Sequence, residues 1–204
     1  GNEELLIRDH FRDATNGFFV DVGAAWPIRY SNTYYLEKHL GWSGIAVDAL
    51  PEYGAAWREA RPRSRFFSYL VSDHSDTVDS FYRFELTGIS SNRPDPTRGP
   101  GVGVGFEEIL VPTTTLNRLL EQNEVSYIDL LSMDIEGAEL EALRGFDIDR
   151  FGPKLVCIEA KPANRERLLE YFSSHGYQQV DRYLQHDQTN YYFTPKQESR
   201  STDW

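Results

Sequence analysis

Apolar runs and segments of helical periodicity alternate along most of this chain of 204 residues. Continuous apolar runs are typical of strands that are buried on both faces of a sheet. They predict five strands, over residues 17–23, 44–48, 65–71, 127–133 and 154–158. Amphipathic or capped segments predict helices over about residues 2–14, 31–40, 51–57, 137–144 and 165–174, and one more after the threonines at 113–115. Regular alternation of strands and helices favours a mainly parallel sheet.

Two of these helices carry finer signals. Ser31 or Asn32 is placed to cap the helix that ends near residue 40, because short polar side chains accept hydrogen bonds from free backbone N–H groups. In the last helix, the spacing of Leu168, Leu169 and Phe172 predicts that all three face inward.

The chain ends in two strand-like runs, residues 177–183 and 189–194, with only a short link between them. A parallel pair needs a crossover of a dozen or more residues, so we expect these two strands to pair antiparallel. The sequence therefore predicts an α/β fold of the Rossmann-like, doubly wound type. Its mainly parallel, seven-stranded sheet ends in an antiparallel hairpin. Residues 78–84 alternate loosely and predict an additional strand.

The length suits a single domain over residues 1–204. Within it we expect an N-terminal helix at about 2–14, a variable loop at about 86–108 and a polar tail at about 196–204. The loop is rich in Gly, Pro, Ser and Asn and is long for a compact domain. Two interpretations stay open for it, a lid over the substrate or a tolerated insertion.

The formal net charge is −11, which disfavours nucleic acid as a partner. No apolar run approaches the roughly 20 residues that span a bilayer, so we expect no membrane partner. The single cysteine demands no oxidising compartment, so we expect a cytoplasmic protein. Arg58, Arg61, Arg63 and Arg65 form a basic cluster, for which we favour a solvated surface over a contact with an anionic substrate. Cys157 lies in an apolar run and is expected to be a small buried hydrophobe.

Acidic residues recur at the ends of the predicted strands. Ligands of open α/β sheets bind at the carboxyl ends of the strands, near the point where strand order reverses. Each acid alone is explained by turn capping, but their joint placement favours a binding site. The residues are Asp21, Asp48, Asp73, Asp134 and Glu159.

The first turn argues against a dinucleotide. Gly23 permits close approach of a ligand, but the later glycines of a dinucleotide fingerprint are absent, and Trp26-Pro27 is bulky. A small zwitterion fits better, since free backbone N–H groups receive a carboxylate and Asp21 favours a cation. A carboxylate at Asp48 is placed to accept hydrogen bonds from both ribose hydroxyls. An adenosine joined to an amino acid through a cationic sulfur is S-adenosylmethionine.

Several motifs resemble the FkbM family of methyltransferases. They are Asp21-Val22-Gly23, Ser31-Asn32-Thr33-Tyr34, Leu40-Gly41-Trp42-Ser43-Gly44, Leu143-Arg144-Gly145-Phe146 and Gly176-Tyr177, and most specifically Ser132-Met133-Asp134-Ile135-Glu136-Gly137-Ala138-Glu139. The resemblance covers about residues 17–194. It implies the class I methyltransferase fold, whose sheet ends in a hairpin, and S-adenosylmethionine as the methyl donor.

The resemblance also implies which residues hold the cofactor, with Ser72 and Asp73 reaching the adenine. The implied set is Asp21, Gly23, Ala24, Asn32, Asp48, Ala49, Ser72, Asp73 and Asp134. Two positions depart from the family pattern. The second strand ends Asp48-Ala49-Leu50-Pro51 where the family often has Glu-Pro, and Ser132 stands where lysine is common.

The resemblance further implies a hydroxyl acceptor on a sugar or small natural product. Methyl transfer depends on alignment of donor and acceptor, and a hydroxyl must also lose a proton. We expect Asp134 beside the methionine end of the cofactor and Glu136 or Glu159 nearer the acceptor, while Glu139 faces away or supports the helix start. His74 and His186 are loop histidines for which a surface role is favoured over that of a base.

Alternatives stay open at this point. A divalent metal, magnesium or calcium, held by Asp134, Glu159 and a nearby side chain is one, although no ligand motif supports it and no metal site is assigned. Others are a nitrogen or carboxylate acceptor, or a non-catalytic module that binds a nucleoside or a partner. A nicotinamide-dependent oxidoreductase is disfavoured by the first turn and by the terminal hairpin.

Overall fold

A computed structural model describes residues 2–84, 90–91 and 106–196 of the chain. Two sheets and seven α-helices are assigned in this part. The main sheet contains β1 (Phe18–Val22), β2 (Ser43–Asp48), β3 (Ser64–Ser68), β8 (Leu130–Met133), β9 (Leu155–Glu159), β10 (Tyr177–Gln179) and β11 (Asn190–Pro195). The second contains β4 (Leu70–Val71), β5 (Val78–Phe84), β6 (Ser90–Ser91) and β7 (Phe106–Thr114). The helices are α1 (Glu3–Phe11), α2 (Tyr34–Leu40), α3 (Tyr53–Ala60), α4 (Leu116–Gln122), α5 (Glu139–Arg144), α6 (Ile148–Phe151) and α7 (Arg165–Ser174), with a 3-10 turn η1 (Asp181–Tyr183).

The main sheet has the predicted topology. Its strand order is β10-β11-β9-β8-β1-β2-β3, and strand order reverses at β1, which pairs in parallel with both β2 and β8. β11 runs antiparallel to β9 and to β10, so the terminal hairpin is confirmed. Its first strand is shorter than expected, because residues 181–183 form η1 instead of continuing the strand.

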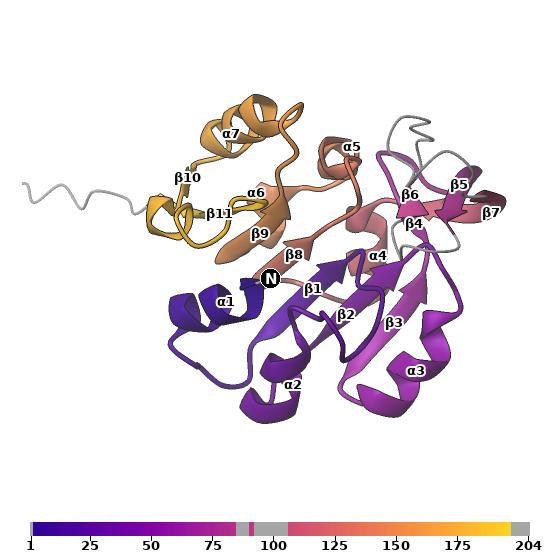
Figure 1. Cartoon of the computed structure of the whole chain (residues 1–204), viewed down its shortest axis with the longest axis horizontal. Helices are drawn as coiled ribbons and strands as arrows, with labels where there is room; N and C mark the ends of the chain where they lie inside the picture. Colours follow the sequence, from indigo (N-terminus) through magenta and orange to yellow (C-terminus); the bar gives the residue numbers. More distant parts are fainter. Residues whose placement is uncertain (1, 85–89, 92–105, 197–204) are drawn as a thin grey trace, which may run out of the picture.

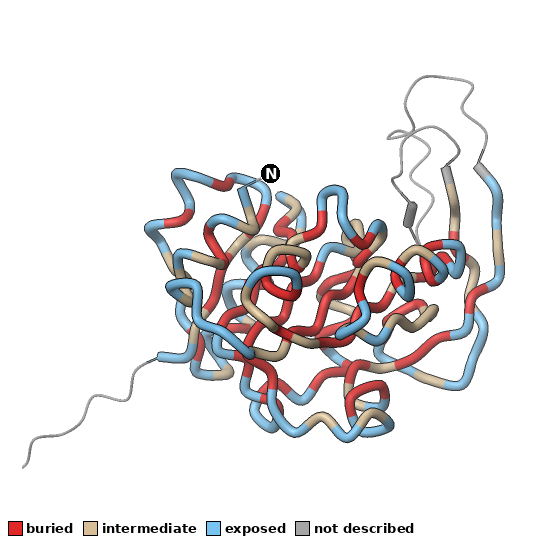
Figure 2. Tube along the Cα trace, turned by 90° about the horizontal axis from the view of Figure 1, so that it is seen from below, coloured by how far each residue is buried: buried red, intermediate tan, exposed pale blue. Residues whose placement is uncertain are grey.

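Helices cover both faces of this sheet (Figure 1). Side chains of successive strand residues point to opposite faces, so Val20 and Val22 pack with α4, α5, α6 and α7, whereas Phe19 packs with α1 and α2. α3 packs on the same side as α1 and α2 through Trp57. Figure 2 shows the buried stretches of the chain gathered in the interior, with exposed stretches around them. Cys157 is buried in β9, as expected.

The second sheet was only partly predicted. β5 is the additional strand over 78–84, but the expected third strand over 65–71 is divided, since β3 pairs with β2 and β4 pairs with β7. β7 was missed, and it shows that residues 106–108 are strand and not loop. Figure 1 places this sheet at the arrowhead end of β2 and β3. The remainder of the predicted loop, apart from β6, and most of the polar tail lie outside the described residues.

Several local predictions need correction. Neither Ser31 nor Asn32 caps α2, which starts after Thr33 with no side-chain cap. Leu169 is exposed at 36%, so only Leu168 and Phe172 of the last helix face the core. α6 was not predicted. None of the helices in the described ranges combines the length and apolar composition needed to cross a bilayer.

The packing of α7 on the terminal hairpin gives a test of the fold. Phe172 is fully buried and its ring stacks on Phe193 of β11 with the centroids 4.0 Å apart. Because truncation leaves a cavity, we expect Phe172→Ala to lower the free energy of unfolding by about 3–5 kcal/mol. Leu169→Ala, on the exposed side of the same helix, should cost about 1 kcal/mol or less. Urea unfolding measures both, and equal losses would contradict this packing.

Candidate functional site

A cavity of about 330 Å³ opens at the carboxyl ends of β1, β2 and β8. This is the edge at which ligands bind in open α/β sheets. Six of the predicted site residues line it: Gly23, Ala24, Asp48, Ala49, Asp134 and Glu136. The remainder of the predicted set, Asp21, Asn32, Ser72, Asp73 and Glu159, lies outside this lining.

The innermost wall of the cavity is formed where the turn after β1 meets the turn after β8. Gly23 has a φ of +80°, and a Cβ atom built on it would lie 1.8 Å from the backbone oxygen of Asp134. The N–H of Gly23 donates to Val47 O at 2.9 Å, and the N–H of Asp134 donates to Val22 O at 2.9 Å. Only glycine fits this contact, because both its backbone conformation and the available space exclude a side chain.

Asp48 is held rigidly at the end of β2. Its Oδ2 accepts a hydrogen bond from the Ala25 N–H at 3.0 Å, and its Oδ1 accepts one from the Leu50 N–H at 2.9 Å. Burial raises the pKa of Asp48 to about 6, against the lowering effect of these two bonds. Each carboxylate oxygen has a second lone pair, so both remain able to accept a hydrogen bond from a ligand in the cavity.

Asp21 and Asn32 stand behind the cavity wall instead of in it. Asp21 is buried and its Oδ2 accepts a hydrogen bond from the Thr33 hydroxyl at 2.8 Å. Burial raises the pKa of Asp21, while the hydrogen bond from Thr33 and the charge of Arg61 oppose that rise. Asn32 donates to the Ser132 hydroxyl at 3.2 Å and so ties the first loop to β8.

The solvated position expected for the basic cluster is wrong for one of its members. Arg58, Arg63 and Arg65 are exposed, but Arg61 is 1% exposed. Its Nε donates to Glu37 at 2.7 Å, and the rest of its guanidinium donates to Pro27 O, the Ser31 hydroxyl, and Thr33 O and Oγ1 at 2.8–3.2 Å. A single buried cation therefore fixes the loop between β1 and α2 from beneath.

Three non-glycine residues in the cavity lining have left-handed backbone conformations. They are Ala25, Tyr30 and Glu136, with φ values of 41°, 62° and 57°. Such strain costs about 1–3 kcal/mol per residue and concentrates at functional sites, where the surrounding structure enforces it.

The acidic residues proposed for catalysis are brought together with a lysine that the sequence patterns did not single out. Lys161 Nζ lies 2.5 Å from Glu136 Oε2 and 3.3 Å from Glu159 Oε2. Desolvation raises the pKa of Asp134 to about 7 and that of Glu159 to about 8, and the neighbouring carboxylates add to both shifts. The sequence could have predicted this position of Lys161, since it follows Glu159 by two residues at the end of a strand and so lies at the same edge of the sheet.

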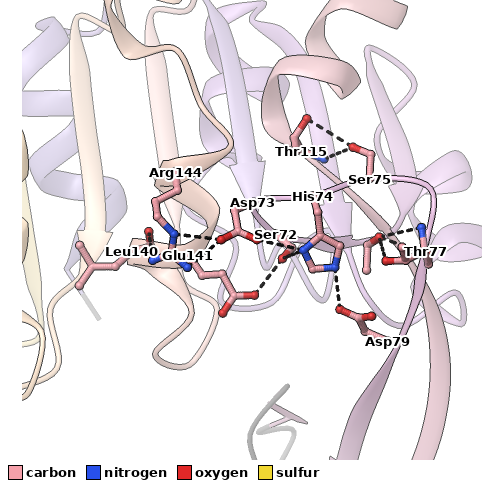
Figure 3. Close-up of polar contacts among 11 residues, drawn as sticks. Ser72, Asp73, His74, Ser75, Thr77, Asp79, Thr115, Leu140, Glu141 and Arg144 are labelled. Atoms are coloured by element: carbon pink, nitrogen blue, oxygen red, sulfur yellow. Dashed lines mark hydrogen bonds and ion pairs between the residues drawn. The ribbon is translucent and has the colours of Figure 1, made fainter.

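Ser72 and Asp73 are occupied by a separate polar network (Figure 3). Asp73 pairs with Arg144 at 2.8 Å and with His74 at 2.9 Å, and the other ring nitrogen of His74 lies 3.1 Å from Asp79. The Ser72 hydroxyl donates to Glu141 at 2.8 Å. Hydrogen bonds from His74 and Arg144 lower the pKa of Asp73, and the hydrogen bond to Asp73 raises that of His74. This network joins β4, α5 and β5 beside the cavity.

The outer rim of the cavity is aromatic, which was not predicted from the sequence. Trp26 is 52% exposed and packs edge-on against Tyr53, with ring centroids 4.9 Å apart. Tyr30 is 80% exposed and lies under the Arg29 guanidinium at 4.7 Å. All four residues line the cavity. The aromatic residues in and after the first turn were the available sequence signal, but the bulk of Trp26 alone indicates only that a pyrophosphate is disfavoured.

Comparison with known protein families decides the assignment that this geometry supports. The model of the methyltransferase FkbM domain matches residues 21–179, most of the chain. The chain belongs to the FkbM methyltransferase family. The predicted resemblance is thereby confirmed, and the matched region of this FkbM-family protein runs from the end of β1 to the end of β10. No curated protein matches the chain in sequence.

One solved structure supports the class I methyltransferase fold of this FkbM-family chain, and two others are reported as similar. The METTL16 methyltransferase domain matches with a TM-score of 0.55 and 10% identity, covering 96% of this chain and 66% of that one. A TehB-like S-adenosylmethionine-dependent methyltransferase from Corynebacterium glutamicum has a TM-score of 0.49 and 14% identity, with coverage of 95% and 88%. A putative RNA methyltransferase from Pyrococcus horikoshii has a TM-score of 0.48 and 14% identity, with coverage of 96% and 83%. At such low identity these likenesses concern the fold alone.

The contact at Gly23 can be tested against a glycine of matched backbone conformation. Gly176 has a φ of +74°, but no heavy atom lies within 4 Å of the point that a Cβ atom would occupy there. Gly176→Ala should cost about 1–2 kcal/mol of unfolding free energy for the left-handed conformation alone. Gly23→Ala adds a clash with the Asp134 carbonyl and should cost at least about 1–3 kcal/mol more. Thermal unfolding of both variants measures the difference, and equal losses would refute the close approach.

The buried pair of Arg61 and Glu37 predicts strong coupling. Removing one partner leaves an uncompensated buried charge, so we expect Arg61→Met and Glu37→Gln each to destabilise the protein by about 3–5 kcal/mol. The double variant should lose clearly less than the two single losses combined. Urea unfolding of the four proteins gives the coupling energy, with the exposed Arg58→Met as a control expected within about 0.5 kcal/mol of wild type. Additive losses would show that the two side chains do not act as a pair.

Proposed function

We propose that this protein transfers a methyl group from S-adenosylmethionine to a hydroxyl group of a sugar or another small natural product. The observation that carries the proposal is the convergence of Gly23, Asp48 and Asp134 on one cavity at the reversal point of the sheet. A site with these groups suits a nucleoside with a cationic amino-acid end, and family membership supports that choice.

In this proposal the nucleoside lies across the end of β2. Asp48 accepts hydrogen bonds from the two ribose hydroxyls, because its oxygens have free lone pairs and its position is fixed by two backbone N–H groups. The adenine occupies the apolar part of the cavity, against Leu50, Tyr53 and Phe81. Ser72 and Asp73 follow Val71, which lines the cavity, so their predicted contact with the adenine stays a proposal for the cofactor-bound state.

The amino-acid end of the cofactor points toward β8. Gly23 and Ala24 bring backbone close to the ligand, Asp134 attracts the sulfonium, and Asp21 and Asn32 hold the surrounding loop. The acceptor oxygen attacks the methyl carbon as the bond from sulfur to that carbon breaks. The electron pair passes to sulfur, which leaves S-adenosylhomocysteine, and the hydroxyl proton passes to a carboxylate. Glu136 lines the cavity and is placed to receive it, with Glu159 behind.

The rim of the cavity supports a small organic acceptor. Exposed aromatic side chains beside a cavity mark ligand-binding surfaces, and the flat faces of Trp26 and Tyr30 suit the apolar face of a sugar ring. A net charge of −11 opposes a nucleic-acid acceptor. A screen of hydroxyl, amine and carboxylate acceptors with labelled donor separates these options. Cofactor binding without turnover of any of them would instead indicate a binding module.

Cofactor binding is tested by calorimetry with S-adenosylmethionine, S-adenosylhomocysteine and NAD. We expect saturable binding of the first two only, and Asp48→Ala should weaken it by about 10- to 100-fold, because charge-assisted hydrogen bonds to the ribose are lost. The matched control is Asp149→Ala, an exposed acid on α6, which precedes the opposite end of β9. Its affinity should equal that of wild type. Binding of NAD alone, or an unchanged affinity in Asp48→Ala, would defeat the proposal.

A further inference from the structure

Three carboxylates from separate elements meet beside the inner end of the cavity. Asp134 follows β8, Glu139 begins α5 and Glu159 ends β9. One oxygen atom from each lies within 4.8 Å of the other two. Two oxygens bound to one ion lie at most about 5 Å apart for calcium, with bonds of about 2.3–2.6 Å, and about 4.2 Å apart for magnesium, with bonds of about 2.0–2.1 Å. The three groups therefore lie within the reach of one calcium-sized ion, and an inward movement of about half an ångström brings them within the reach of a smaller ion such as magnesium.

Two of these carboxylates carry buried oxygens without a hydrogen bond. Glu139 is fully buried and Glu159 is 8% exposed. The Oε2 atoms of both have no hydrogen-bond partner among the described residues. Glu139 Oε1, in contrast, accepts the N–H groups of Gly137 at 2.9 Å and Ile135 at 3.3 Å, which confirms its predicted support of the helix start. An ionised carboxylate oxygen that is buried without a hydrogen bond is costly, so a cation bound between these two groups would stabilise their ionised form.

The cation nearest the cluster is shared between two carboxyl groups. Lys161 Nζ lies 2.5 Å from Glu136 Oε2, to which it donates a hydrogen bond, and forms a longer ion pair of 3.3 Å with Glu159 Oε2. Among the described residues, no ion pair is formed by Asp134 or Glu139. The cluster therefore brings together more acidic groups than the neighbouring lysine pairs with.

We propose that Asp134, Glu139 and Glu159 bind one divalent metal ion of the oxygen-preferring class, such as Mg²⁺ or Mn²⁺. All-carboxylate ligands suit such ions and not softer metals, which prefer nitrogen or sulfur. Three protein ligands leave positions open in an octahedral ion. Asp134 also lines the cavity, so an ion held by this cluster would lie beside the bound ligand.

The role of the ion rests on the proposed function. A metal-held hydroxyl loses its proton more easily than a free one, which would prepare the acceptor for attack on the methyl carbon. The hydroxyl proton leaves to Glu136 or water, and the sulfonium becomes a thioether as the bond from sulfur to the methyl carbon breaks. This assigns Glu159 as a metal ligand instead of a proton acceptor, and it adds Glu139 as a second ligand.

The test measures Mn²⁺ binding to the cofactor-free protein by electron paramagnetic resonance. We expect one saturable Mn²⁺ per chain, displaced by Mg²⁺ and not by K⁺. Glu159→Gln and Glu139→Gln should each weaken binding by at least tenfold. Glu166→Gln, an exposed acid in the first turn of α7, should bind as wild type does. Circular dichroism checks the fold of each variant, and Asp134→Asn replaces Glu139→Gln if loss of the turn hydrogen bonds unfolds the latter.

The outcomes separate this inference from the proposed function. Absence of saturable Mn²⁺ binding overturns it, even where S-adenosylhomocysteine binds normally, and leaves Lys161 as the counter-ion of the cluster. Equal Mn²⁺ affinity in wild type and Glu159→Gln also overturns it, because the ion then lies elsewhere. Mn²⁺ binding that is lost in both variants supports the site. If S-adenosylhomocysteine fails to bind in the same preparation, the proposed methyl transfer is contradicted, and the metal site is not.

Discussion

The contact between the turns after β1 and β8 sets the geometry of everything around it. Gly23 and the Asp134 carbonyl approach so closely that no side chain fits between them, and backbone hydrogen bonds tie the first turn to β2 and the second to β1. This contact lies where strand order reverses, so the helices on either side diverge and leave a cavity. The residues that end each strand consequently face one another across a short distance, although they lie far apart in the sequence.

The same arrangement places carboxyl groups at the ends of the strands, where few water molecules can solvate them. Burial raises the pKa values of Asp48, Asp134 and Glu159 toward or above neutrality, which means that the folded protein holds these carboxylates at a cost. Strained backbone at Ala25, Tyr30 and Glu136 adds to that cost. Such features are typical of binding sites, because a bound ligand supplies compensating charge or hydrogen bonds. The buried guanidinium of Arg61 stabilises the loop between β1 and α2, because it donates hydrogen bonds to five oxygen atoms.

Sequence patterns predicted the sheet well because its strands are apolar on both faces, and the short link before β11 allowed only antiparallel pairing. They also placed Asp48 and Asp134 at one edge, since parallel strands end together. They failed where contacts between distant segments decide the outcome. Arg61 is charged and follows a helix, so its local sequence gave no sign that it would be buried in an ion pair with Glu37. β7 was missed because it depends on pairing with β5 across a long insertion. The sequence indicated only that Glu139 lies near a helix start, and its position beside Glu159 follows from the fold.

The central claim is that this edge of the sheet holds the nucleoside of a methyl donor. A crystal structure of the protein grown with S-adenosylhomocysteine tests it most directly. The account predicts both ribose hydroxyls on the Asp48 carboxylate, with the amino-acid end beside Gly23 and the sulfur facing Asp134. A nucleoside bound at another surface, or a cavity that stays empty at saturating ligand, would contradict it.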